Sequence, residues 1–241
     1  MNFALIFAGG TGTRMHTKTK PKQFLELNGK PIIIHTIEHF ENHPEIDGIV
    51  VVCVKDWIEY LNSFLDKFHI RKVKKVIPGG QSGQESIFLG LSCIEEQLSQ
   101  DKERDLVLVH DGVRPLIDSE LISRNIACAQ KFGNAITIAP MIETVIKINS
   151  ENEISETIDR DRCRNAKAPQ TFHLKEILDC QRKARCEGRS FIDCATMMAA
   201  YGHRLYTVPC GTENIKITTP ADFYIFRAIC EARENSQIWG I

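Results

Sequence analysis

A glycine-rich loop near the start of the chain contains residue types that bind anions. Residues 8–15 read AGGTGTRM and follow an apolar run at residues 3–7. Glycines let a backbone approach a ligand closely with its amides pointing at an anion, and Arg14 adds a fixed positive charge. Lys22 lies a short distance further on, where Pro21 partly presets the backbone. This pattern predicts a phosphate-binding loop in which two cations stabilise charge in a transition state.

Three standard phosphate-binding patterns fit such a position, and the residues exclude two of them. A Walker A loop needs Gly-Lys followed by Ser or Thr, but Thr13 and Arg14 follow the last glycine. The dinucleotide pattern GxGxxG needs a third glycine where this chain has Met15. A strand-to-loop turn whose glycines face an anion remains, and a merely tight turn with surface cations stays an alternative.

Histidines and cysteines offer weaker signals for a metal or redox site. His35, His39 and His43 recur every fourth residue and would share one helical face, but the HExxH glutamate and a nearby cysteine are absent. We therefore interpret this segment as an amphipathic helix rather than a zinc site. The nine cysteines are scattered without a CxxC pair, which favours free thiols in a reducing compartment.

Length and charge limit the classes of function. The chain has 241 residues, 43% of them hydrophobic, which is enough for one domain (1–241) with a substantial core. Thirty basic and 31 acidic side chains leave a net charge of -1, so no overall field attracts nucleic acid or a membrane surface. The apolar start is too short for a signal peptide, and no run approaches the roughly 18 apolar residues of a membrane span. We expect a cytoplasmic protein.

Apolar runs alternate with amphipathic stretches along the first part of the chain. The predicted strands are residues 3–7, 48–54, 73–77, 105–110 and 134–140. The predicted helices are residues 32–40, 57–68, 86–98 and 120–131. Strands that are apolar throughout belong in a parallel sheet covered on both faces. The order predicts an α/β fold with a doubly wound, mostly parallel sheet of Rossmann-like type, whose ligands bind beyond the carboxyl ends of the strands.

One segment breaks this alternation. Residues 143–159 read as two alternating strands around a polar turn at 149–153, which predicts a β-hairpin. A hairpin cannot easily bury its own apolar side, so we expect a protruding β-arm at about residues 141–161 that packs on a second subunit. An ordinary edge hairpin folded back on its own domain is the alternative.

Further segments resemble one enzyme family in order along almost the whole chain. They are AGGTGTRM, PKQFLELNGKPIIIHTIEHF, PGGQSGQESIFLGL, VLVHDGVRP, APMIETVIK, TIDRDRCRNAKAPQTF and ENIKITTPADF. They are similar to nucleotidyltransferases that make CDP-linked alditols. Two sister groups share the pattern, the ribitol-5-phosphate and the 2-C-methyl-D-erythritol 4-phosphate cytidylyltransferases. The Asp-Trp at 56–57 and the Val-Arg-Pro at 113–115 resemble the ribitol group more.

The resemblance implies a Rossmann-like nucleotidyltransferase that transfers CMP from CTP to an alditol phosphate with Mg²⁺ as cofactor. Its implied CTP-binding residues are Ala8, Gly9, Gly10, Thr11, Gly12, Thr13, Gly80, Gln81, Ser86 and Asp111. The catalytic cations would be Arg14, Lys22 and Lys216. The acceptor would be bound by Arg114, and by Thr144 and Arg160 from the arm of the partner in a homodimer.

Asp111 has an alternative role, and its neighbour His110 has no expected part in the reaction. Asp111 follows an apolar strand, where its carboxylate can hold magnesium or the water around it, or instead cap the next turn. We expect a structural role for the adjacent His110. A phosphate monoester is mostly ionised at cytosolic pH, so its attack on CTP needs no general base.

The resemblance favours ribitol 5-phosphate as acceptor, with CDP-ribitol for teichoic acid or capsule synthesis as its product. Ala168 and Ile192 stand where the erythritol group commonly has threonines, so two hydroxyls are missing from the expected acceptor pocket. Methylerythritol phosphate is the alternative acceptor. A non-catalytic nucleotide sensor and a nucleotidyltransferase for another base are further alternatives, but the first would not need both Arg14 and Lys22.

Overall fold

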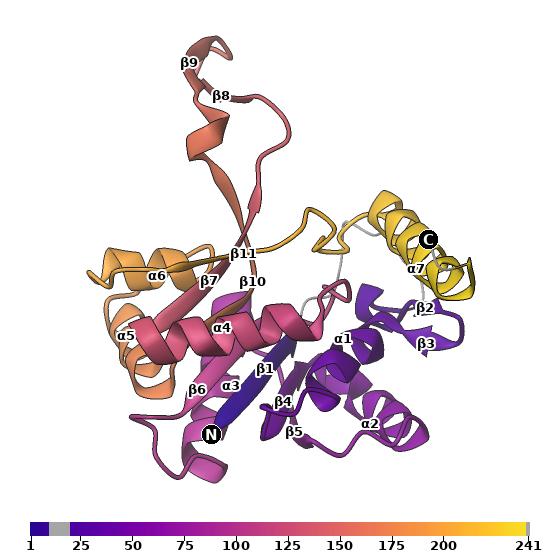
Figure 1. Ribbon diagram of the computed structural model, residues 1–241. Coiled ribbons are helices and arrows are strands. Elements are labelled where there is room, and N and C mark those ends of the chain that lie inside the picture. Colours follow the sequence, from indigo (N-terminus) through magenta and orange to yellow (C-terminus); the bar gives the residue numbers. More distant parts are fainter. Residues whose placement is uncertain (10–19, 240–241) are drawn as a thin grey trace.

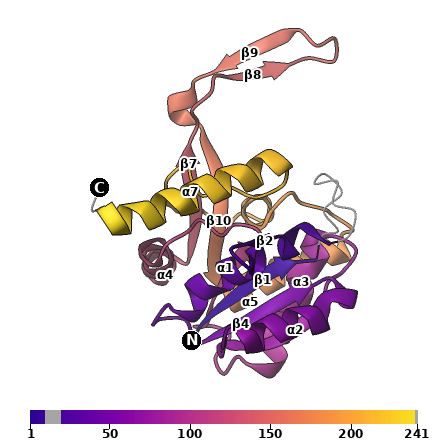
Figure 2. The same ribbon diagram turned by 90° about the vertical axis from the view of Figure 1, so that its right-hand side faces the viewer.

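A single seven-stranded sheet organises the protein. The computed structural model describes residues 1–9 and 20–239, so most of the glycine-rich loop, including Arg14, lies outside the described residues. The sheet has the strand order β11-β7-β10-β6-β1-β4-β5, and helices lie against both of its faces (Figures 1 and 2). This is the mixed α/β fold with a mostly parallel sheet that the sequence predicts.

The predicted parallel strands form one side of this sheet. They are β1 (Asn2–Ala8), β4 (Gly48–Cys53), β5 (Val73–Pro78) and β6 (Leu106–Asp111). In β1, Ala4 and Ile6 contribute to the core on one face, and Phe3 and Leu5 contribute to the core on the other. Because successive side chains point to opposite faces, a strand buried on both sides must be apolar throughout.

The two faces are covered by different helices. One core includes residues of α1 (Ile32–Glu41), α2 (Ile58–Lys67) and α4 (Ser119–Phe132). The other includes residues of α3 (Gly83–Gln97), α5 (Leu174–Cys186) and α6 (Cys194–Ala200). The four helices predicted from the sequence are therefore confirmed, with ends that differ by a few residues.

The sheet also contains a long antiparallel strand that the sequence analysis does not predict. The strand β10 (Arg164–His173) runs antiparallel between β6 and β7 (Asn134–Pro140), and the short β11 (Thr207–Pro209) pairs parallel to β7. Its amino-terminal half is exposed and polar, and Pro169 interrupts its second half, so no continuous apolar run marks it.

Short elements complete the chain. They are β2 (Glu26–Leu27), β3 (Lys30–Pro31), the 3-10 turns η2 (Lys22–Phe24), η3 (Lys55–Trp57) and η4 (Arg160–Arg162), and the carboxyl-terminal α7 (Pro220–Trp239). Phe226 of α7 packs with Ile32, Leu116 and Ile217 in a small third core. No helix of the described residues is both long and apolar enough to cross a membrane.

The strands β8 (Val145–Ile148) and β9 (Ile154–Ile158) form a separate antiparallel hairpin. Both views show it extending away from the body of the molecule (Figures 1 and 2). Four isoleucines of this region are strongly exposed: Ile142 (63%), Ile146 (46%), Ile148 (56%) and Ile154 (65%). The hairpin thus presents apolar surface that the described part of the same chain does not cover.

Gly90 on α3 faces the sheet at a point of close approach, which makes it a test of the packing. A Cβ added there would lie 2.2 Å from Leu5 Cδ1 and 3.0 Å from Val52 Cγ2. Alanine improves helix propensity by about 1 kcal/mol, but overpacking a buried contact costs about 1–3 kcal/mol. We expect Gly90→Ala to lower the free energy of unfolding by about 1–2 kcal/mol in urea titrations, because the overpacking cost prevails.

Gly83→Ala serves as the matched control, because a Cβ at this position of the same helix meets no atom within 4 Å. We expect its free energy of unfolding to stay within about 0.5 kcal/mol of that of the parent protein. Equal stability of the two variants would contradict the packing described here.

Candidate active site

Two adjoining cavities open beyond the carboxyl ends of β1 and β6. The first, here called the loop cavity, has a volume of about 230 Å³ and lies among the end of β1, the η2 turn and the loop before α3. The second, here called the inner cavity, has a volume of about 420 Å³ and lies among α3, β6, β10 and the start of α6. Asp111 and Lys216 line both cavities.

The loop cavity brings together many of the residues predicted to bind a nucleotide. Eight predicted site residues line it: Ala8, Gly9, Lys22, Gly80, Gln81, Ser86, Asp111 and Lys216. Gly10, Thr11, Gly12, Thr13 and Arg14 lie outside the described residues. Segments far apart in the sequence therefore meet at one edge of the sheet, as expected for the carboxyl ends of parallel strands.

The loop before α3 lies at the loop cavity because its backbone packs closely against the backbone at the end of β1. A Cβ on Gly9 would lie 2.9 Å from Ser86 Oγ, and a Cβ on Gly79 would lie 3.1 Å from Gly9 Cα, so a larger residue at either position would displace its neighbour. The amide of Gly80 donates to Ser86 Oγ at 3.1 Å. The Ser86 hydroxyl, predicted to bind the nucleotide, also holds the loop in shape.

Two side-chain caps, closely similar to a capping box, fix the start of α3. Ser82 Oγ accepts a hydrogen bond from the Glu85 amide at 3.1 Å, and Glu85 Oε2 accepts one from the Gln81 amide at 2.8 Å. Reciprocal bonds of this kind satisfy amides at a helix start. Ser82 and Gly83 line both cavities, although the sequence analysis does not select them.

Gln23 anchors the turn that carries Lys22. Its side chain is buried, and its Nε2 donates to the carbonyl oxygen of Ala8 at 2.7 Å. This bond fastens the η2 turn to the end of β1, so Lys22 is held at the loop cavity. Gln23 is not among the site residues predicted from the sequence, because a lone glutamine close to two lysines gives no sign that it will be buried.

Asp111 lies at the junction of the two cavities and contacts two cations. Its Oδ2 accepts from Arg114 Nε at 2.8 Å, and its Oδ1 lies 2.5 Å from Lys216 Nζ. Burial alone would raise the pKa of Asp111, but the charges and hydrogen bonds of Arg114 and Lys216 outweigh it and lower the pKa to about 2. The carboxylate is ionised at any physiological pH. It contacts these cations rather than capping the following turn.

Three hydrogen bonds, two of them from side chains, hold the segment that carries Lys216. Arg114 Nη1 donates to the Asn214 carbonyl at 3.0 Å, and Asn214 Nδ2 donates to the Ala168 carbonyl on β10 at 2.7 Å. The Ile217 amide donates to the Val113 carbonyl at 2.9 Å. Lys216 is a predicted site residue, but Asn214, whose buried side chain ties this segment to β10, is not.

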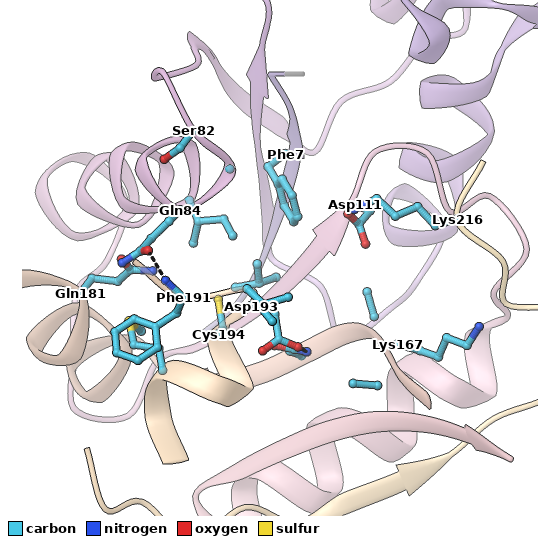
Figure 3. Close-up of a pocket in the computed structure, with 18 of the residues that line it drawn as sticks. Phe7, Ser82, Gln84, Asp111, Lys167, Gln181, Phe191, Asp193, Cys194 and Lys216 are labelled. Carbon is cyan, nitrogen blue, oxygen red and sulfur yellow. Dashed lines mark hydrogen bonds and ion pairs between the residues drawn. The ribbon is translucent and has the colours of Figure 1, made fainter. Parts of the chain in front are cut away.

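The inner cavity contains the positions expected to distinguish acceptors. Arg114 and the buried Ala168 line it together, whereas Ile192 lies at its rim and is 96% exposed. Gln170 Nε2 donates to Asp193 Oδ2 at 3.0 Å, and Gln170 Oε1 accepts from the Ala195 amide. Figure 3 shows Asp111, Lys167 and Lys216 on one side of this cavity and Gln181 and Phe191 on the other.

Thr144 and Arg160 are not brought to either cavity within one chain. They lie at the base of the hairpin, where Arg160 Nη1 donates to the Ile142 carbonyl at 3.0 Å. The hairpin between them extends away from the sheet, and neither residue lines a cavity of its own chain as the structure describes it.

The histidines bond to backbone carbonyl oxygens. The Nε2 atoms of His35, His39 and His43 lie 2.8–3.3 Å from the carbonyls of Leu27, Pro115 and Ser119, which supports the amphipathic-helix interpretation. His110 is fully buried, and its Nε2 lies 3.1 Å from the Arg114 carbonyl. Burial lowers the pKa of His110 to about 4. It is a neutral residue that supports the Asp111–Arg114 turn.

A sequence model of the 2-C-methyl-D-erythritol 4-phosphate cytidylyltransferase family matches residues 3–232. The chain belongs to this family. Cytidylyltransferases are nucleotidyltransferases, so the protein is an enzyme of that class, as the sequence resemblance implies.

Individual relatives of this cytidylyltransferase divide between the two sister groups. It is 52% identical to a ribitol-5-phosphate cytidylyltransferase of Vibrio parahaemolyticus and 50% identical to one of Streptococcus agalactiae, over 100% of each chain. Among solved structures, 4-diphosphocytidyl-2C-methyl-D-erythritol synthase from Anaerococcus prevotii matches with a TM-score of 0.82. That match has 27% identity and covers 95% of this chain and 96% of the other.

The buried imidazole of His110 makes the stability of the cytidylyltransferase depend on pH. Its pKa is lower in the folded than in the unfolded state, so unfolding takes up a proton between pH 6.5 and about 4. We expect the contribution of His110 to the free energy of unfolding to be fully present above pH 6.5. It should decrease as the pH falls, by up to about 3 kcal/mol near pH 4. Urea unfolding measured from pH 4.5 to 7.5 checks this slope.

His110→Gln is the informative variant, because an amide can keep the bond to the Arg114 carbonyl without titrating. We expect it to reduce the slope but not abolish it, since burial also lowers the pKa of His35 and His39. An unchanged slope in this variant would show that His110 does not contribute.

Proposed function

We propose that this enzyme transfers CMP from CTP to D-ribitol 5-phosphate and forms CDP-ribitol and pyrophosphate. The observation that carries the proposal is the 50–52% identity, over complete chains, to two ribitol-5-phosphate cytidylyltransferases. Ala168 in the inner cavity agrees with it, because this residue offers no hydroxyl to a branched acceptor.

In this proposal CTP occupies the loop cavity. The backbone around Gly9 and Gly80 is close enough to contact a nucleotide, and Lys22 and Lys216 bring positive charge to its triphosphate. Arg14 and the glycines before it would complete the contacts with the phosphates. The acceptor occupies the inner cavity with its phosphate toward Arg114 and Lys216, where the two cavities adjoin.

The reaction needs no general base from the protein. An oxygen of the acceptor phosphate attacks the α-phosphorus of CTP in line, the bond to the bridging oxygen of the β-phosphate breaks, and pyrophosphate leaves. The second pKa of a phosphate monoester is about 6, so the nucleophile is already ionised at neutral pH. Catalysis then consists of positioning two polyanions and neutralising their charge.

Magnesium fits this site as a partner of the triphosphate. Asp111 is the one carboxylate among the described residues that line the loop cavity, and those residues contain no cluster that could hold a metal alone. Magnesium commonly combines one carboxylate with phosphate oxygens and waters. Both Asp111 oxygens already contact cations, so contact through bound water suits it best. The ion would supply charge neutralisation on the phosphates.

The same proposal includes a homodimer formed through the hairpin. Its exposed isoleucines are apolar surface of the kind that a second subunit covers. Thr144 and Arg160 would then reach the acceptor site of the partner. We further propose a cytoplasmic enzyme that supplies CDP-ribitol to teichoic acid or capsule synthesis, which agrees with nine free cysteines.

A pyrophosphate-release assay with CTP and Mg²⁺ tests the acceptor. We expect kcat/KM for D-ribitol 5-phosphate to exceed that for 2-C-methyl-D-erythritol 4-phosphate at least about tenfold, since pocket contacts of this size discriminate by about 1–3 kcal/mol. UTP in place of CTP is the control for the base. A preference for methylerythritol phosphate would overturn the proposed acceptor and leave the cytidylyl transfer intact.

Hybrid dimers test whether Arg160 beside the hairpin acts in the active site of the partner subunit. Lys22→Ala and Arg160→Ala should each lower turnover by at least about a hundredfold, because each removes a cation that acts on phosphates. A purified hybrid of the two variants, selected with two different tags, has one intact site if Arg160 acts across the interface. We expect it to recover about half of the wild-type turnover.

A hybrid as inactive as its parents would exclude action across the interface. Size-exclusion chromatography of each variant is the control, because the comparison requires that all of them remain dimers.

A further inference from the structure

The inner cavity extends well beyond the charged residues that would receive a phosphate. Its cationic side contains Arg114 and Lys216 beside Asp111, and Lys167 also lies there. Its opposite side contains Gln181 from α5, with Gln84 and Phe191 beside it (Figure 3). A ligand that fills this space meets positive charge at one end and uncharged amides at the other.

Gln181 has an unusual hydrogen-bonding state. The residue is 1% exposed, and within the part of the chain that the structure describes no donor forms a hydrogen bond with its Oε1. A buried carbonyl oxygen without a partner destabilises the fold, so such an atom in a native protein calls for an explanation. Here the oxygen belongs to a residue that lines a cavity.

The neighbouring amide of Gln84 is fixed through its own oxygen, and it forms no hydrogen bond with Gln181 Oε1. Gln84 Oε1 accepts a hydrogen bond from the Phe191 amide at 2.9 Å, which fixes Gln84 and the loop before α6 together. Gln181 itself is held by α5, whose Ile177, Leu178 and Ala184 are fully buried in the core. Gln181 is therefore held in place where it lines the cavity, with its oxygen buried and without a partner among the described residues.

We propose that Gln181 determines acceptor specificity by accepting a hydrogen bond from the hydroxyl at the end of the polyol remote from its phosphate. This inference rests on the proposed function, because it assigns the end of the acceptor to one residue of the same site. In D-ribitol 5-phosphate the hydroxyl concerned is the one on C1.

The chemistry of the two sides of the inner cavity favours a polyol phosphate as ligand. An anionic group is favoured beside Arg114 and Lys216, where one carboxylate faces two cations. An uncharged carbonyl oxygen attracts a donor and gains nothing from a second anion. A molecule with a phosphate at one end and a hydroxyl at the other satisfies both sides. A site that hydrogen-bonds a hydroxyl discriminates strongly against the analogue that lacks it.

Paired changes in enzyme and acceptor test the contact. The acceptors are D-ribitol 5-phosphate and 1-deoxy-D-ribitol 5-phosphate, and the variant is Gln181→Met, which keeps the side-chain length but has no carbonyl oxygen. In the wild type we expect removal of the hydroxyl to lower kcat/KM about five- to tenfold, mainly through KM. In Gln181→Met the two acceptors should be used equally well, with the KM for CTP unchanged.

Stability separates this role from a structural one. Removing an unpartnered buried oxygen should leave the melting temperature of Gln181→Met unchanged or raise it, whereas loss of a structural bond would lower it. Gln97→Met is the matched control, because Gln97 is exposed near the end of α3 and lines neither cavity. It should discriminate between the two acceptors as the wild type does.

The outcomes distinguish this inference from the proposed function. If the wild type releases no pyrophosphate with D-ribitol 5-phosphate, the proposed function fails. If the wild type uses both acceptors equally, the inference fails whether or not the variant folds. If Gln181→Met still prefers the hydroxylated acceptor, or loses turnover with both acceptors alike, the inference fails and the proposed function stands.

Discussion

The ion cluster of Asp111, Arg114 and Lys216 is the interaction on which the site depends. A buried carboxylate is stable only when opposite charges and hydrogen bonds compensate its lost hydration, and two cations do so here. They come from the turn after β6 and from a segment that is distant in the sequence, so the cluster also joins these parts of the fold. One negative charge against two positive charges leaves a local surplus that suits phosphate groups, in a protein whose net charge is only -1.

The sheet places this cluster where two substrates can meet. β1 and β6 are parallel neighbours, so Gly9 and Asp111 emerge at the same edge, and the Gly112 amide donates to the Phe7 carbonyl at 3.0 Å. β10 runs antiparallel beside β6 and brings Ala168 to the other side of the cluster. The loop cavity and the inner cavity therefore share one charged wall, which is the arrangement that joining two polyanions requires.

Much of this arrangement can be predicted from the sequence, and the exceptions have physical reasons. β1, β4 and β6 are apolar because helices cover both faces of the sheet, so their sequence reveals them. β10 escapes prediction because its first half is exposed and polar and Pro169 interrupts the rest. Gln23, Asn214 and Gln181 escape it for another reason, because a polar residue alone does not reveal whether it will be buried or what it will contact.

The sequence by itself determined the alternation of strands and helices, the glycine-rich approach to an anion and the cations at the site. These features follow from local backbone preferences and from the periodicity of apolar residues. Only the tertiary structure decided that Lys216 pairs with Asp111 and that Thr144 and Arg160 line neither cavity of their own chain. It also decided that Gln181 lines a cavity while its oxygen has no partner among the described residues. Such contacts join residues far apart in the chain, and they form only where packing of the whole sheet brings them together.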